Sequence, residues 1–94
     1  MKNFLDISEF VKTSTAQSVT EDLVKRFKKR RKESGMTQKE LSLRSGVSYA
    51  SIRRFETSGD ISLSSLISIA RVVKCLDDFN SLFCTPIIGN LKDY

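Results

Sequence analysis

The stretch TQKELSLRSGVSYASIRRFE, residues 37–56, decides the fold of this chain. Thr37 and Ser48 stand where a side-chain hydroxyl can cap a helix, and Gly46 between them suits a tight turn at positive φ. Two short helices that cross steeply bury only a few side chains and leave the outer face of the second helix free. The pattern therefore predicts a helix-turn-helix unit whose inward anchors are Leu41, Val47, Ile52 and Phe55.

Helical spacing continues on both sides of this unit. Ser18 and Glu21 are spaced like a capping box, which predicts a first helix from about 20 to 34, closed by Gly35. The residues expected to face inward from it are Val19, Leu23 and Phe27, followed by the aliphatic stems of Arg30 and Arg31. Ser62 is the expected cap of a fourth helix with an apolar stripe of Leu63, Leu66, Ile69, Ala70 and Val73. A last helix is expected near Asp77 to Phe83.

No run of residues alternates as a half-buried strand does, so the expected fold is all-α: a compact five-helix domain over residues 18–83. Residues 1–17 form an N-terminal arm in which Phe4 to Val11 suit a short amphipathic helix. Residues 84–94 form a C-terminal tail, either a short strand or without regular structure.

Length and composition narrow the class of protein. Ninety-four residues are enough for one domain with a modest core. No apolar run approaches the roughly 18 residues of a membrane span, and no secretory signal is recognisable, so we expect a cytoplasmic protein. Two cysteines, Cys75 and Cys84, without any histidine cannot complete a zinc site. With no glycine-rich phosphate loop and no recognisable pair of catalytic carboxylates, we expect neither an enzyme nor a cofactor.

Positive charge is concentrated in one segment. Residues 20–60 hold eleven of the 16 Lys and Arg but six of the 11 Asp and Glu, which accounts for the whole net charge of +5. A localised positive field attracts polyanions, of which nucleic acid is the commonest, followed by an anionic membrane surface. A solvated helix face is the competing interpretation for the run from Lys25 to Lys32.

Residues 20–83 resemble the phage-repressor (Cro and lambda-repressor) helix-turn-helix family of bacterial regulators, which includes HipB-like antitoxins. The resemblance runs from RRKESGMTQKELS through SGVSYASIRRFE to SLSSLISIARVV, about two thirds of the chain. It implies that the helix after Ser48 enters the major groove of double-stranded DNA.

The family pattern implies roles for individual residues. Those matching base contacts on the third helix are Tyr49, Ala50 and Arg54. Gln38 matches a phosphate-binding glutamine, and further phosphate contacts are expected from Lys39, Ser48, Ser51 and Arg53. Arg31 and Glu56 match a structural ion pair between the first and third helices.

Three positions depart from the family pattern. Ser42 replaces the usual alanine at the closest approach of the two helices, and Ser45 replaces a residue that is often apolar, so less packing is expected there. The loop after the third helix lacks basic residues, and Asp60 in that loop is expected to oppose phosphate.

Relatives commonly pair through the helix that follows the core, and two reading helices about 34 Å apart would match a palindromic operator. A homodimer interface is expected at Leu76, Phe79, Leu82 and Phe83, although Leu76 and Phe79 could equally close the core. Three functions remain open at this point. They are an autonomous repressor, an antitoxin that also holds a toxin protein, and an interaction adaptor that no longer reads DNA.

Overall fold

The computed structural model describes residues 13–87, which form four α-helices and one 3-10 helix. The α-helices are α1 (Ala16–Glu33), α2 (Gln38–Ser45), α3 (Tyr49–Ser58) and α4 (Leu63–Val72), and the 3-10 helix is η2 (Leu76–Ser81). No strand occurs among these residues. The all-α prediction is thus confirmed for the part of the chain described; the Phe4 to Val11 segment and residues 88–94 lie outside it.

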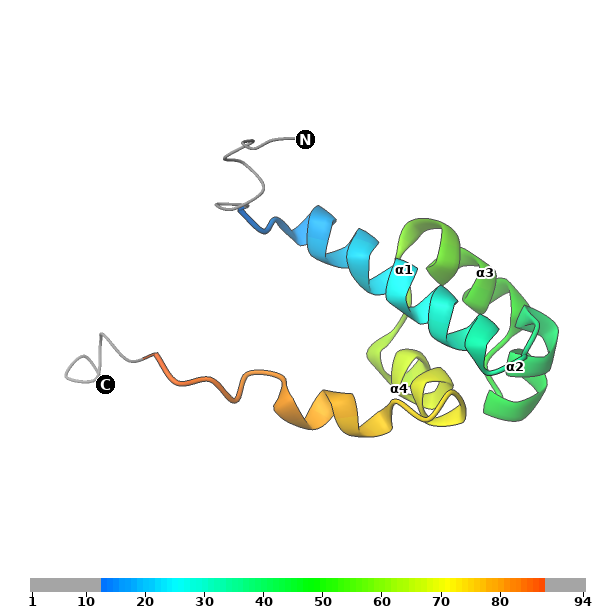
Figure 1. The fold of residues 1–94 in the computed structure, drawn as a ribbon. Helices are drawn as coiled ribbons and strands as arrows, with labels where there is room; N and C mark the ends of the chain where they lie inside the picture. The colour runs from blue at the N-terminus through cyan, green and yellow to red at the C-terminus, as the bar shows by residue number, and fades with distance from the viewer. Residues whose placement is uncertain (1–12, 88–94) are drawn as a thin grey trace, which may run out of the picture.

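The core lies where α1, α2, α3 and α4 meet. Leu41, Ile52 and Ile69 are fully buried, and Phe55 is 1% exposed. The Phe27 and Phe55 rings meet edge to face with centroids 5.4 Å apart, which joins α1 to α3. In Figure 1, α2 lies at the far end of the long α1, and α3 runs back beside α1, so that the end of α3 meets the first half of α1. The chain after α4 runs back toward the side from which α1 starts.

The first helix begins earlier than the sequence analysis predicted. Its N-cap is Thr15, whose hydroxyl accepts a hydrogen bond from the Ser18 N–H (3.0 Å), while the Ser18 hydroxyl accepts one from the Thr15 N–H (2.9 Å). Ser18 is therefore the third residue of the helix and not its cap. Of the residues expected to face inward, Phe27 and Arg31 are buried. Val24 takes the place of Val19 and Leu23, which are 52% and 37% exposed, and Arg30 is exposed.

Two further predictions near the C-terminus need correction. Leu63 is 66% exposed, so the buried stripe of α4 starts at the half-buried Leu66 and continues through Ile69, Ala70 and Val73. The last helix is a 3-10 helix that ends at Ser81, before Phe83. Since α4 already closes the core, η2 has no buried residue of its own, and its packing gives no reason to continue as an α-helix.

Candidate nucleic-acid interface

The turn between α2 and α3 is fixed by local hydrogen bonds. Gly46 ends α2 at φ 79°, and its N–H donates to the Ser42 carbonyl (3.0 Å). The Ser42 hydroxyl donates to the Val47 carbonyl (2.6 Å), and the Ser45 hydroxyl accepts from the Val47 N–H (3.1 Å). The two serines that depart from the family pattern thus satisfy both backbone groups of Val47, a buried residue that would otherwise leave them unpaired.

The second helix starts with a complete capping box. The Thr37 hydroxyl accepts from the Glu40 N–H (3.1 Å), and the Glu40 carboxylate accepts from the Thr37 N–H (2.8 Å). This backbone hydrogen bond lowers the pKa of the Glu40 carboxyl below its ordinary value. The box fixes the N-terminus of α2 at the point where Gln38 and Lys39 follow.

The outer face of α3 is exposed to solvent. Tyr49, Ala50, Arg53 and Arg54 are exposed, while Ile52 and Phe55 on the opposite face are buried. A shallow hollow of about 320 Å³ runs along this face over Ala50, Arg53, Arg54, Thr57 and Ser58. Ala50 is the smallest of these side chains, so the hollow places an apolar methyl group within reach of a ligand.

Tyr49 gathers positive charge at the start of α3. The Lys39 ammonium lies 5.7 Å from the centre of its ring, and the Arg53 guanidinium carbon lies 5.6 Å from it. Both distances fall within the range of cation–π attraction. A residue of α2 and a residue of α3 that were each expected at phosphate are thus brought together by one aromatic ring.

Arg31, Glu56 and Gln38 form one buried network. Arg31 Nε and Nη2 donate to the two Glu56 carboxylate oxygens at 2.7 and 2.9 Å, and Arg31 Nη1 donates to the Met36 carbonyl at 2.8 Å. Gln38 Nε2 donates to the same Glu56 carboxylate at 2.9 Å. The hydrogen bonds with Glu56 raise the pKa of Arg31 against the opposing effect of burial, so the guanidinium stays charged.

The Gln38 contact with Glu56 has no signal in the sequence. The Gln38 side-chain amide still has one N–H and its oxygen for another partner. The Gln38 backbone N–H is among the first-turn donors of α2 that have no acceptor within the helix. The structure therefore places Gln38 at the N-terminus of α2 with its side chain half-buried and partly engaged.

Ser48 and Ser51 are also engaged with each other. The Ser48 hydroxyl accepts from the Ser51 N–H (3.1 Å) and donates to the Ser51 hydroxyl (2.8 Å). The Ser51 hydroxyl proton remains free to donate to a ligand.

Asp60 lies beside the arginine expected to read a base. Arg54 Nη1 is 3.5 Å from Asp60 Oδ2, and both side chains are well exposed. Asp60 was expected to oppose phosphate and not to pair with Arg54, because six residues and a turn separate the two. Gly59 at φ 84° makes that turn.

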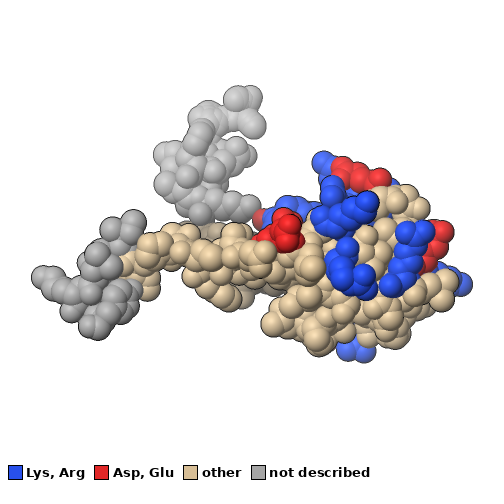
Figure 2. Space-filling view, turned by 90° about the horizontal axis from the view of Figure 1, so that it is seen from below, with Lys and Arg blue, Asp and Glu red and all other residues tan. Residues whose placement is uncertain are grey.

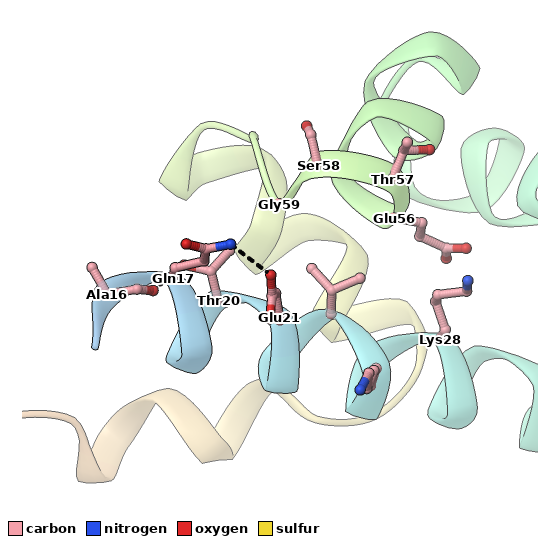
Figure 3. Close-up of a pocket in the computed structure, with 11 residues that line it drawn as sticks. Ala16, Gln17, Thr20, Glu21, Lys28, Glu56, Thr57, Ser58 and Gly59 are labelled. Carbon is pink, nitrogen blue, oxygen red and sulfur yellow. Dashed lines mark hydrogen bonds between the residues drawn. The ribbon is translucent and has the colours of Figure 1, made fainter. Parts of the chain in front are cut away.

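The end of α3 approaches α1 closely at Gly59. In Figure 3, Gly59 lies above Thr20 across a groove of about 590 Å³ between the first half of α1 and the end of α3. The groove carries a Gln17 amide that donates to the Glu21 carboxylate (3.0 Å, dashed in the figure). A Cβ atom on Gly59 would collide with Thr20 Cγ2, so this glycine lets the reading helix rest on α1.

Of the four apolar residues expected at a dimer interface, Leu76 and Phe79 lie on η2, and Leu82 and Phe83 follow it directly. We call η2 together with residues 82–87 the tail. Leu76 is 41% exposed, Leu82 is 53% exposed and Phe83 is 100% exposed, while Phe79 is half-buried. Figure 2 shows Lys and Arg side chains on the body and none along this tail. The basic surface and the apolar surface are thus separate.

Neither a membrane-spanning helix nor a metal-binding cluster is found among residues 13–87. No helix in this range is long and apolar enough to cross a membrane. Within the same range, no three His, Cys, Asp or Glu side chains are grouped so as to hold a metal ion.

Comparison with protein families matches residues 27–76, more than half of the chain, to the helix-turn-helix family. The chain belongs to this family, the Cro and lambda-repressor type of helix-turn-helix protein, and is of the DNA-binding transcription regulator type. This class is a regulatory and not an enzymatic one. Neither the curated proteins nor the solved structures gave a match.

Proposed function

We propose that this protein is a repressor that binds a palindromic operator as a homodimer and reads the major groove with α3. The observation that carries the proposal is the division of α3 into a buried face with Ile52 and Phe55 and a free face with Tyr49, Ala50 and Arg54. An α-helix fits the major groove, and residues near its N-terminus reach the base edges there. A regulator of this kind acts in the cytoplasm.

Base reading is assigned to three side chains. The Arg54 guanidinium can donate two hydrogen bonds to O6 and N7 of a guanine, the commonest specific contact in the major groove. The hollow at Ala50 suits a thymine methyl group. Tyr49 can contact a base edge with its hydroxyl while its ring holds the two cations.

Phosphate binding is assigned to the groups around the N-termini of α2 and α3. Lys39 and Arg53, which share the Tyr49 ring, supply charge. Gln38, Ser48 and Ser51 supply hydrogen-bond donors at the helix starts, where the helix dipoles also favour anions. These contacts set the register of the protein on DNA and carry no sequence information.

The tail is assigned to dimerisation. Leu82 and Phe83 are apolar and exposed in the single chain, and burying them against a second copy would remove that surface from water. A dimer also presents its second α3 at high effective concentration once the first has bound.

Selection of bound fragments from randomised duplexes tests this function. The expected product is a palindrome whose half-sites repeat at about one helical turn or a multiple of it. Recovery of random sequence would contradict the proposal and would favour an adaptor whose DNA binding is only weak and salt-sensitive.

The two adjacent arginines of α3 give a matched pair of variants. Arg54→Ala should cost about 1 to 3 kcal/mol of binding free energy on the selected site and relax the choice of one base pair. Arg53→Ala should weaken binding to all sequences and flatten the salt dependence by about 0.9 in the log–log slope. Fluorescence anisotropy on selected and random duplexes at several salt concentrations distinguishes them. Equal losses for Arg54→Ala on both duplexes would remove it from the reading role.

An antitoxin is the second candidate, and the exposed apolar tail favours it. Leu82, Phe83 and Ile87 could cover a toxin protein instead of a second copy of the chain. Co-expression with the product of the neighbouring gene distinguishes the two: a stable complex that buries the tail supports the antitoxin, while a lone homodimer supports the repressor.

A further inference from the structure

Asp60 is a negative charge on the face assigned to DNA, and the structure holds it in place. The Asp60 N–H donates to the Ser58 hydroxyl (3.3 Å), and that hydroxyl donates to the Arg54 carbonyl (2.8 Å). Gly59 turns the chain in the left-handed conformation between them. The loop is thus tied back to the Arg54 backbone, which leaves the Asp60 carboxylate beside the Arg54 guanidinium.

The contact between the two side chains is weak enough to be broken. It joins one nitrogen to one oxygen at 3.5 Å, and the two side chains are 63% and 71% exposed. Exposed pairs of this kind contribute little to stability. A ligand that offers the guanidinium two well-aligned acceptors can therefore replace Asp60.

Guanine and phosphate differ as replacements. Guanine offers two acceptors, O6 and N7, without a net charge, so it can take the guanidinium while Asp60 stays nearby. A phosphate brings a second negative charge toward the Asp60 carboxylate, which opposes it. The Asp60 carboxylate thus disfavours phosphate, which carries no sequence information, more than it disfavours guanine.

We propose that Asp60 is a specificity-determining positioning residue: by holding Arg54 in the free protein, it suppresses binding of this arginine to phosphate and leaves it available to guanine. The inference rests on the proposed function, in which Arg54 reads a base. The negative charge of Asp60 alone indicates only weaker binding to DNA, whereas its contact with Arg54 gives this residue a role in selectivity.

The test compares Asp60→Asn with the wild type on the selected duplex and on random duplexes. Affinity for random DNA should rise about two- to fivefold, the range expected for an exposed ion pair. Affinity for the selected site should rise less, so that the ratio of the two falls. The salt slope on random DNA should steepen by about 0.9, as for one additional phosphate contact.

Three controls separate this role from a general change of charge. Asp78→Asn on η2 removes the same charge from another element and should leave the ratio unchanged. Asp60→Asn in an Arg54→Ala background should have no more effect than Asp78→Asn. Asp60→Glu keeps the charge and should keep most of the ratio.

The outcomes are distinguishable from a failure of the proposed function. An equal rise on both duplexes, or an undiminished effect of Asp60→Asn without Arg54, would overturn the role of Asp60 alone. A wild-type protein that shows no preference for the selected duplex would overturn that role and the repressor function together.

Discussion

Glu56 accepts hydrogen bonds from two helices at once. Its side chain is only 3% exposed, and its carboxylate is bound by Arg31 from α1 and Gln38 from α2. A buried carboxylate with a bidentate arginine is tolerated because the charge is compensated on the spot. Removal of the arginine leaves that charge uncompensated, and the neutral Gln38 amide cannot replace it.

Arg31→Met should therefore lower the free energy of unfolding by about 3 to 5 kcal/mol, a large fraction of the stability of a small domain. Urea denaturation followed by circular dichroism measures this loss. The double variant Arg31→Met/Glu56→Leu removes both charges and should be closer to the wild type than the single variant. A double variant that is less stable than Arg31→Met would show that the pair contributes more than charge compensation.

Glu40 makes the stability of the domain depend on pH. Its folded-state pKa is lowered, so the unfolded state binds a proton more readily; the stabilisation is present above the unfolded pKa of about 4.3 and is lost as pH falls through the folded value. Glu40→Gln preserves the shape of the capping box without titrating. The melting temperature of the wild type should exceed that of Glu40→Gln at neutral pH, and the two should converge in acid. A difference independent of pH would contradict this cause.

At the scale of helices, the position of α3 depends on Gly59. Its left-handed φ is shared with Gly46, but only Gly59 faces a neighbour, Thr20 Cγ2 on α1. Thr20 is β-branched and its hydroxyl donates to the Ala16 carbonyl (2.8 Å), so the methyl group cannot turn away without losing that hydrogen bond.

Gly59→Ala should thus destabilise the domain more than Gly46→Ala. Both incur about 1 to 2 kcal/mol for a left-handed alanine, and Gly59→Ala adds an overpacking cost of about 1 to 3 kcal/mol. In the Gly59→Ala background, Thr20→Ser removes the methyl group and keeps the hydroxyl, and it should recover the stability lost to overpacking. Denaturant midpoints of the wild type, the two glycine variants and the Gly59→Ala/Thr20→Ser double variant measure these differences. Equal losses for the two glycine variants would show that α1 shifts to accept the new methyl group without loss of stability.

The helix starts within the helix-turn-helix unit were predictable because caps are local. Thr37 with Glu40, Gly46 and Ser48 occupy the predicted positions. The start of α1 was not predictable in the same way, because Thr15 and Ser18 are both capping residues. Ser18 with Glu21 fits the capping-box pattern as well as Thr15 with Ser18 does. The buried face of α1 was also ambiguous in sequence, since it is decided by the distant Gly59 and Phe55.

The site was only partly predictable from the sequence. Exposure of Tyr49, Ala50 and Arg54 follows from the helical spacing of Ile52 and Phe55, which face inward. The Arg54 contact with Asp60 and the Gln38 contact with Glu56 depend on how side chains meet across turns. Such contacts leave no periodic signal; the sequence indicated only that Asp60 is an acidic residue in a loop without basic residues.

In the whole molecule, we assign dimerisation to the apolar tail and DNA binding to the basic body. Leu82→Ser/Phe83→Ser should shift the protein to monomers in sedimentation, with an affinity for the full palindrome reduced by about 10²- to 10⁴-fold toward that of one half-site. Thermal stability of the monomer should not change, because both side chains are exposed.

Leu43→Ser provides the matched control for the tail variant. Leu43 is 85% exposed on α2, outside the proposed interface, so its replacement should leave the dimer intact. A dimer that survives the tail variant and is lost with Leu43→Ser would place the interface on the body.

The Glu56 network also bears on the kinetics of binding. Because one carboxylate already joins α1, α2 and α3 in the free protein, the surface that we propose for the major groove is formed before DNA binds, and we expect no segment among these helices to order on contact. The arrival rate is then governed by diffusion and by the attraction between the basic body and the duplex. Preference for one operator over another should therefore reside in how long the complex lasts once formed.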